Sequence, residues 1–433
     1  MISTVYDRLH TSAEARPAAT PTPRTRRAKA SSVAALLLGV LSLGTATESQ
    51  AIPAYTRQTG MACAGCHFQH YPSLNEFGRA FKAGGYTLMG KQGLIDGENL
   101  SLPEVLNAGI VMKARYQETN GPTVTGTHNK NNGQLQLFDE MLLMLGGRVS
   151  ENIGVQLELN LLAKDEPVVE QFKMPFVYDV GGVKAGVVLF TTAGHGVSYG
   201  FELLNTGATR GQRIMEHRKE FSAQQYIGTG SAAEGFAAVA YTPLFFANLS
   251  KWSPRSVGDA SGDPSANYVR LAVTPSVGSW DLGAGIQYWD GSATDPTLVI
   301  FDTKAWAVDG QAQGAIGALP LGIYLSSANA SGTDVGATNK NFFNGNPNDK
   351  TATALAAELG VVPGKATVML AYRKGDNGKA TKNGDNAWTL AGTYQIVQNM
   401  HLQLNYSKYS GSAFEPLPAN GDQLLTLMLF GGF

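Results

Sequence analysis

Residues 106–433 are dominated by one pattern, the alternation of apolar residues with polar or small ones. Rows of this kind occupy residues 106–116, 152–161, 172–180, 280–289 and 402–407. Successive side chains of a β-strand point to opposite faces, so a period of two predicts strands with one apolar face. The pattern therefore predicts an all-β fold for this part of the chain.

Two all-β architectures fit such strands. A soluble sandwich or small barrel would bury the apolar faces, whereas an outer-membrane barrel would turn them to lipid and line its lumen with the polar faces. Roughly 330 residues, at about 20 residues per strand and connection, give about 16 strands, as in a porin. Charged residues make up only 15% of the chain, which is low for a soluble surface. These observations favour the membrane barrel.

Aromatic residues and the last strand support the same architecture. Tyr116, Tyr178, Tyr288 and Tyr406 end apolar rows, as the aromatic girdles of membrane barrels do. The segment Leu424–Phe433 is apolar and has an aromatic last residue. We expect this segment to be the strand that closes the barrel against its first strand.

The connections between the rows differ in length. Residues 181–182 and 277–279 form short turns, whereas residues 118–133, 250–267 and 328–351 are long and polar. Short periplasmic turns and long outer loops are typical of outer-membrane barrels. The sequence therefore predicts an antiparallel barrel in the outer membrane of a Gram-negative bacterium.

Residues 1–51 resemble an export signal. Four basic residues between Arg24 and Lys29 precede the apolar run Val33–Leu43, and Ser49-Gln50-Ala51 offers small residues for cleavage after Ala51. The run is short for a transmembrane anchor, which is the alternative. We therefore expect residues 1–51 to be a signal peptide, residues 52–105 a small N-terminal helical segment and residues 106–433 the barrel.

The small segment carries the motif Cys63-Ala64-Gly65-Cys66-His67, with the C-x-x-C-H spacing of a c-type haem attachment site. Cys63 and Cys66 would form thioethers to one covalent haem, and His67 would be its proximal axial ligand. A redox dithiol or half of a zinc site is the alternative. The chain has only two cysteines, and no βαβ pattern surrounds the motif, so haem attachment is favoured.

A helix is predicted directly after the motif. Ser73-Leu74-Asn75-Glu76 has the pattern of a capping box. Leu74, Phe77 and Phe81 recur on one helical face, and Gly84-Gly85 would end the helix after about three turns. We expect these apolar side chains to pack on the haem or on a neighbouring wall.

Several candidates exist for the distal haem ligand. Met89 follows the predicted helix with enough chain to fold back and is our prediction, with a water or a residue of the barrel as alternatives. Met61 is close to Cys63 in sequence, and His70 reaches the face of the proximal ligand more easily than the opposite one. Arg79 and Lys82 are either solvated or placed to meet the haem propionates.

Several other functions find no support in the sequence. No P-loop, dinucleotide-binding fingerprint, hydrolase elbow or zinc-protease motif is present, and the net charge of −1 does not suggest nucleic-acid binding. His128, His195 and His217 are isolated, and we expect them in loops or in the lumen rather than on a metal.

The segments that flank the motif resemble a known family. Residues 54–62 lead directly into the motif, and residues 71–82, Tyr-Pro-Ser-Leu-Asn-Glu-Phe-Gly-Arg-Ala-Phe-Lys, follow it. Together they resemble the fused monohaem cytochrome–porins, the outer-membrane iron-oxidising cytochromes. The resemblance covers about forty residues. It implies a haem segment that plugs a barrel of about 16 strands.

The resemblance also implies a function. The protein would take electrons from extracellular Fe(II) and pass them through the haem to a periplasmic c-type cytochrome or another soluble electron carrier. Two other functions stay open. One is electron exchange with a different extracellular donor or acceptor, such as metal reduction or cell-to-cell transfer. The other is a diffusion porin with a non-catalytic haem.

Overall fold

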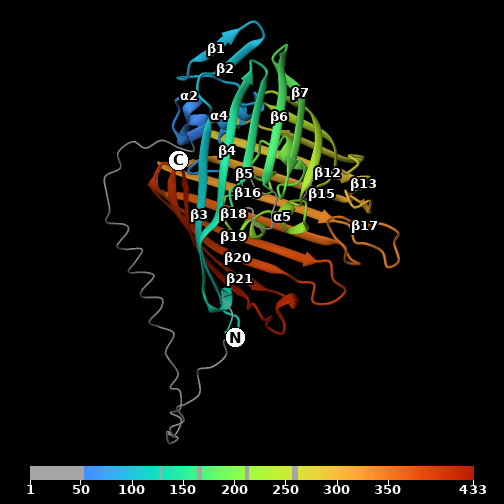
Figure 1. The fold of residues 1–433 in the computed structure, drawn as a ribbon. Coiled ribbons are helices and arrows are strands. Elements are labelled where there is room, and N and C mark those ends of the chain that lie inside the picture. Colours follow the sequence, from blue (N-terminus) through green and yellow to red (C-terminus); the bar gives the residue numbers. More distant parts are fainter. Residues whose placement is uncertain (1–52, 127–128, 163–167, 210–213, 256–261) are drawn as a thin grey trace, which may run out of the picture. The chain divides into compact units, whose positions relative to one another are not determined.

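The computed structural model describes residues 53–126, 129–162, 168–209, 214–255 and 262–433 (Figure 1). The predicted signal peptide, residues 1–51, lies outside the described residues. All described residues fall in one compact unit, Glu48–Phe433. The haem-motif segment and the barrel therefore form a single body.

Sixteen long antiparallel strands within the described residues close into a barrel. They are β3 (Ala108–Thr119), β4 (Gln134–Ser150), β5 (Ile153–Asn160), β6 (Val169–Val180), β7 (Val183–Thr192), β8 (Ala233–Tyr241), β9 (Phe245–Pro254), β10 (Ala266–Val273), β12 (Trp280–Asp290), β15 (Ala305–Ile316), β16 (Leu319–Ala330), β18 (Lys350–Val362), β19 (Ala366–Asn377), β20 (Asn386–Val397), β21 (Met400–Ser410) and β22 (Gln423–Gly432). The short β11 (Ser276–Val277) adds to the pairing of β12. β22 pairs with β3, with Leu429 opposite Ala114. The predicted strand number and closure are confirmed.

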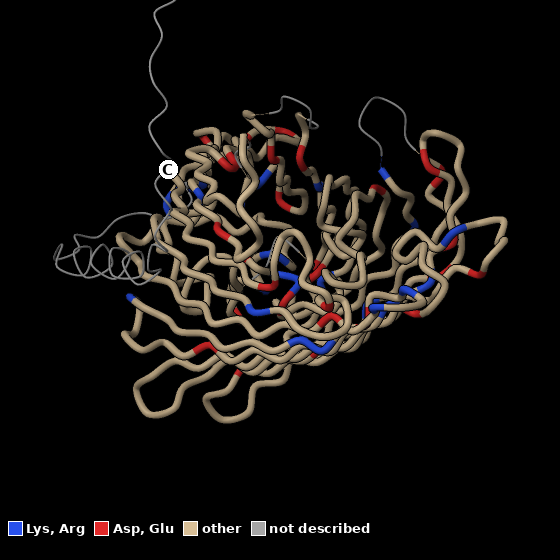
Figure 2. Tube along the Cα trace, turned by 90° about the horizontal axis from the view of Figure 1, so that it is seen from below, with Lys and Arg blue, Asp and Glu red and all other residues tan. Residues whose placement is uncertain are grey.

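The alternation places apolar residues outside and polar residues inside. In β12, Ile286 and Tyr288 are exposed, whereas Gln287 and Trp289 are buried. Figure 2 shows Lys, Arg, Asp and Glu gathered inside the ring of strands and in the loops, with long stretches of strand free of them. A closed barrel satisfies every backbone hydrogen bond without an edge, which is what lipid requires. The fold is that of an outer-membrane β-barrel with a polar interior.

The connections alternate in length. Turns of two to a few residues follow β4, β6, β8, β15, β18 and β20, and longer loops follow β3, β5, β7, β9, β12, β16, β19 and β21. The short turns thus share one end of the barrel, and the long loops share the other. The predicted asymmetry is confirmed, and short turns mark the periplasmic end in outer-membrane barrels.

The N-terminal segment contains three short helices and a hairpin. The helices are α2 (Pro53–Thr59), α3 (Cys63–Cys66) and α4 (Glu76–Ala83), and the hairpin joins β1 (Leu94–Gly97) to β2 (Leu100–Pro103). Figure 1 shows this segment at the end of the barrel where the C-terminus lies. Among the described residues, no helix has the length and hydrophobicity of a membrane span.

The predicted helix after the motif is α4, but it is shorter than expected. Asn75 rather than Ser73 is its N-cap, and the Asn75 side chain accepts a hydrogen bond from the Gly78 N–H. The predicted capping box is wrong because the Ser73 carbonyl oxygen accepts a hydrogen bond from Phe68 N–H, which holds Ser73 in the preceding turn. Phe77 is also exposed rather than packed.

One long connection folds into the barrel, which no sequence pattern predicts. Residues 193–232, between β7 and β8, are buried at most of their described positions, which are 193–209 and 214–232. They include η2 (Val197–Gly200), η3 (Arg218–Glu220) and α5 (Ala223–Ile227). We refer to residues 193–232 as the inward loop. The other long loops carry η1 (Lys130–Asn132), β13 (Ser292–Thr294), β14 (Ile300–Asp302), β17 (Lys340–Asn341) and η4 (Ser412–Phe414).

Candidate functional site

The haem-motif segment is fastened to the inner wall of the barrel near its short-turn end. Arg79 forms a two-point ion pair with Asp281 of β12, at 2.7 and 2.6 Å. His70 Nε2 lies 2.7 Å from a Glu358 carboxylate oxygen of β18, and both side chains are buried. The two pairs join the segment to strands that are not neighbours in the barrel, so they fix its orientation.

The motif itself lies at the rim. Cys63 Sγ is 3.1 Å from the carbonyl oxygen of Gln398, in the short turn between β20 and β21. α3 is a single helical turn, closed by a hydrogen bond from His67 N–H to the Cys63 carbonyl oxygen at 2.9 Å. A side chain at Gly78 would collide with the Cys66 carbonyl, so glycine lets α4 pack directly on the motif.

His67 is oriented for metal binding through one nitrogen. Its Nδ1 lies 3.2 Å from the Ser73 carbonyl oxygen, which leaves Nε2 for a ligand. Loss of water around the imidazole, together with the neighbouring His70, lowers the pKa of His67 to about 4. The imidazole is therefore neutral near pH 7, which is the form that binds iron.

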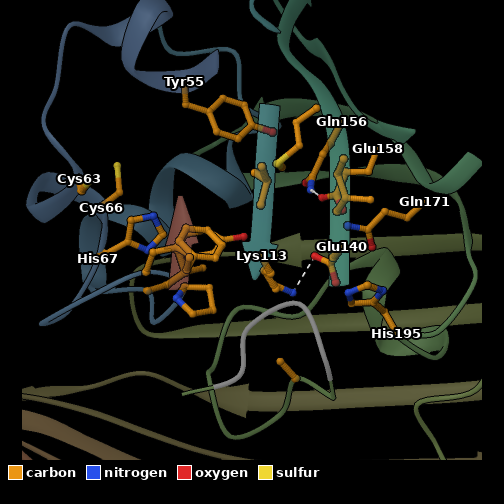
Figure 3. A pocket seen from close by; sticks show the side chains of 18 of the residues that line it. Tyr55, Cys63, Cys66, His67, Lys113, Glu140, Gln156, Glu158, Gln171 and His195 are labelled. Carbon is orange, nitrogen blue, oxygen red and sulfur yellow. Dashed lines mark hydrogen bonds and ion pairs between the residues drawn. The ribbon is translucent and has the colours of Figure 1, made fainter. Parts of the chain in front are cut away.

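A cavity of about 620 Å³ opens beside the motif. Cys63, Cys66 and His67 line one side of it. Figure 3 shows Gln156, Glu158 and Gln171 across the cavity from Cys66 and His67. Its wall comes from α2, α4, β3–β6, β21, β22 and the inward loop. The structure thus brings the three predicted attachment residues together at one enclosed space.

The cavity also extends toward the long-loop end. Phe138, Leu162 and Glu170 line it, and each lies at or near the end of a strand from which a long loop leaves. The cavity therefore connects the motif, at the short-turn end, with the opposite half of the barrel.

The charged side chains of the cavity wall are largely paired. Lys113 lies 2.6 Å from Glu140, and Arg115 pairs with both Asp139 and Glu216. Burial lowers the pKa of Lys82 to about 8, although the Glu202 carboxylate acts in the opposite direction. Lys82 lines the cavity, whereas Arg79 is held by Asp281. Of the two residues considered for haem propionates, only Lys82 is placed for that role.

The site fits a haem on the side-chain evidence. Beside the cavity volume and the motif, the buried hydroxyls of Tyr55 and Tyr199 line the cavity without a hydrogen-bond partner. Buried polar atoms are normally satisfied, so orphaned ones indicate a missing partner. Cys63 and Cys66 would hold a covalent haem, and His67 would ligate its iron.

Met89 does not line the cavity. It follows Leu88, whose carbonyl oxygen accepts a hydrogen bond from the Gln58 side chain at 2.8 Å. The methionines that do line the cavity are Met61, Met144 and Met428. Met89 as the distal ligand thus stays a prediction from the sequence, and the barrel wall offers the alternatives.

The isolated histidines take different places. His217 is buried in the inward loop, where its ring nitrogens lie 2.8 and 2.6 Å from the Ser407 and Thr426 hydroxyls. His195 lines the cavity. His128 lies outside the described residues. No group of three or more His, Cys, Asp or Glu side chains within the described ranges is arranged to hold a metal ion.

Sequence reasoning missed the contribution of the inward loop to the site. Ser198, Tyr199 and Glu202 reach the cavity from this loop. The sequence feature that could have pointed to this loop is the absence of period-two alternation over about forty residues between two clear strands.

No protein-family model and no curated protein matches this chain. Among solved structures it is similar to the outer membrane protein OmpT of Vibrio cholerae, with 12% identity over 79% of this chain and 100% of that one, at a TM-score of 0.43. The outer membrane channel DcaP of Acinetobacter baumannii is 11% identical over 76% and 97% of the two chains, at 0.45. OccK1 (OpdK) of Pseudomonas aeruginosa is 13% identical over 75% and 98%, at 0.41.

Proposed function

We propose that this protein is an outer-membrane c-type cytochrome. It takes electrons from extracellular Fe(II) and passes them to a periplasmic electron carrier. The observation that carries the proposal is the place of Cys63, Cys66 and His67, which line a large cavity inside the barrel at its short-turn end.

The residues of the chain have distinct roles in this proposal. A bound haem would supply one-electron chemistry between the ferric and ferrous states. Cys63 and Cys66 would hold it covalently, and His67, whose ring the Ser73 carbonyl orients, would ligate the iron. Tyr71 stacks on Phe430 with 5.1 Å between ring centroids and packs beside His67, which excludes water from this side.

The two ends of the cavity suit the two partners. Its extension toward the long loops gives a small hydrated cation an approach from outside. The Cys63 thiol at the turn 398–399 sets the attachment edge at the periplasmic rim, where a soluble c-type cytochrome or another carrier can dock. Each Fe(II) gives up one electron and becomes Fe(III), which stays outside the cell while the carrier is reduced. The apolar outer face contacts the membrane lipid.

The direction of electron flow is the first alternative. An outward conduit, for metal reduction or cell-to-cell transfer, would use the same residues with a lower haem potential. A measured midpoint potential separates the two, because a donor such as Fe(II) requires an acceptor of higher potential.

A diffusion porin with a non-catalytic haem is the second alternative, and the barrel fold by itself favours it. The inward loop and the haem-motif segment both bond to the barrel wall, however, the loop to β15 and β21 and the segment to β18 between them. Conductance in a planar bilayer tests this alternative, since a large stable pore would support it.

The direct test adds Fe(II) anaerobically to the purified ferric protein and follows the haem absorption bands. We expect conversion to the reduced spectrum, with one Fe(III) formed per haem. Zn(II), which has no accessible redox state, is the control and should leave the bands unchanged. Failure of Fe(II) to reduce the haem at the growth pH of the organism would overturn iron as the donor.

A further inference from the structure

Lys173 of β6 places a buried ammonium group in the wall of the cavity. The residue is only 3% exposed. Its Nζ lies 3.4 Å from the Tyr199 carbonyl oxygen, 4.1 Å from the centroid of the Tyr199 ring and 5.7 Å from that of Tyr86. Among the ion pairs of the described residues, none within 4.0 Å includes Lys173. A buried charge without a counter-ion is costly, so the site calls for an anion.

Two carboxylates act on the lysines of this cavity, Glu158 on Lys173 and Glu202 on Lys82, and both already have other partners. Glu158 accepts a hydrogen bond from the Gln156 amide at 2.9 Å. Glu202 lies 2.9 Å from the Arg270 guanidinium. Lys82 lines the same cavity and adds a second positive charge near Lys173.

One hydroxyl donor also lines the cavity near Lys173. The Tyr199 hydroxyl is buried, lines the cavity and has no hydrogen-bond partner. It belongs to the residue whose ring lies against the Lys173 ammonium. An ammonium and a phenol that both lack an acidic partner are the donors that a carboxylate would use.

The position of Lys173 relative to the motif decides which carboxylate this is. Gln171 precedes Lys173 by two residues and shares its inward face of β6. Figure 3 shows Gln171 across the cavity from Cys66 and His67. In a c-type haem the propionates lie on the edge opposite the thioether bonds. The edge that carries the propionates would therefore face the wall of Lys173.

We propose that Lys173 and the Tyr199 hydroxyl bind a haem propionate. The inference rests on the proposed haem and names the groups that hold its far edge. A free anion such as chloride or phosphate has the same chemistry for this site and is the competing occupant. The cation also favours the reduced haem, which carries one positive charge less at the iron.

The test compares Lys173→Gln with Lys184→Gln, a matched change at an exposed lysine of the neighbouring β7. The haem c content, the propionate bending band in the resonance Raman spectrum and the midpoint potential are measured for each. We expect full haem attachment in both variants. Lys173→Gln should shift the propionate band and lower the potential, and Lys184→Gln should change neither.

Tyr199→Phe removes only the hydroxyl and gives a second measurement if Lys173→Gln does not fold. It should shift the same Raman band at unchanged haem content. A band that both variants leave in place would overturn the inference while leaving the proposed function intact. A potential of the parent protein that follows the chloride or phosphate concentration would instead identify a free anion. Absence of haem from the parent would overturn the proposed function itself.

Discussion

The buried ion pairs of Arg270 predict how firmly the inward loop is held to the barrel wall. Arg270 of β10 is fully buried. Its guanidinium lies 2.5 Å from Asp309 of β15 and 2.9 Å from Glu202 of the inward loop. Thr206 of the same loop also donates to Asp309, at 2.8 Å. One arginine thus bridges two carboxylates and ties the loop to the barrel wall.

Replacing Arg270 by methionine would remove the guanidinium that joins Glu202 of the inward loop to Asp309 of the wall. Removing one partner of a buried ion pair costs about 3–5 kcal/mol. Since about 1.4 kcal/mol corresponds to a factor of ten, the equilibrium between docked and undocked loop should shift by roughly a hundred- to a few-thousand-fold. We expect the inward loop of Arg270→Met to leave its place for a measurable fraction of the time.

Single-channel conductance in a planar bilayer measures this opening. A barrel of about 16 strands without an inner obstruction leaves an aqueous channel. The parent protein should therefore show little conductance, and Arg270→Met should show frequent large openings. The control is the triple variant Arg270→Met, Glu202→Gln and Asp309→Asn, which removes all three charges and should stay closed. Equal conductance of Arg270→Met and its parent would show that Arg270 does not hold the inward loop in place.

Two further predictions concern the haem-motif segment. Burial alone would lower the pKa of His70, but the Glu358 carboxylate outweighs it and raises the pKa above 6.5. The pair therefore stabilises the fold fully below about pH 6.5 and loses its contribution as the pH rises through the raised pKa. The difference in thermal midpoint between parent and His70→Gln should shrink toward alkaline pH, and a constant difference would contradict this. For the distal ligand, Met89→Leu should abolish the charge-transfer band of a methionine-ligated ferric haem; its loss only in Met144→Leu or Met428→Leu would assign the ligand to the barrel wall.

Much of the barrel could be predicted because its signal is local. Period-two alternation identifies a strand from its own residues, as in the row at 280–289, which is β12. The closing role of Leu424–Phe433 followed from its apolar, aromatic character, and β22 does pair with β3. The C-x-x-C-H motif is equally local, so its spacing alone was enough to single out Cys63, Cys66 and His67.

The remaining features depend on contacts between distant residues. The inward loop is held by partners such as Asp309 and Thr426, which no local pattern links to it. Arg79 has the pattern of a solvated helix residue. It is nevertheless buried and pairs with Asp281, which lies 202 positions further along the chain. Ser73 and Asn75 are both good N-caps, and the local turn closed by the Phe68 N–H on the Ser73 carbonyl oxygen decides between them.

The proposed function requires that one haem is covalently bound inside this barrel. Intact mass spectrometry of the protein purified from outer membranes, with a denaturing gel stained for haem, tests it most directly. We expect one covalent haem per chain in the parent. The double variant Cys63→Ala and Cys66→Ala should carry no haem that survives denaturation. A mature parent protein whose mass shows no haem would contradict it.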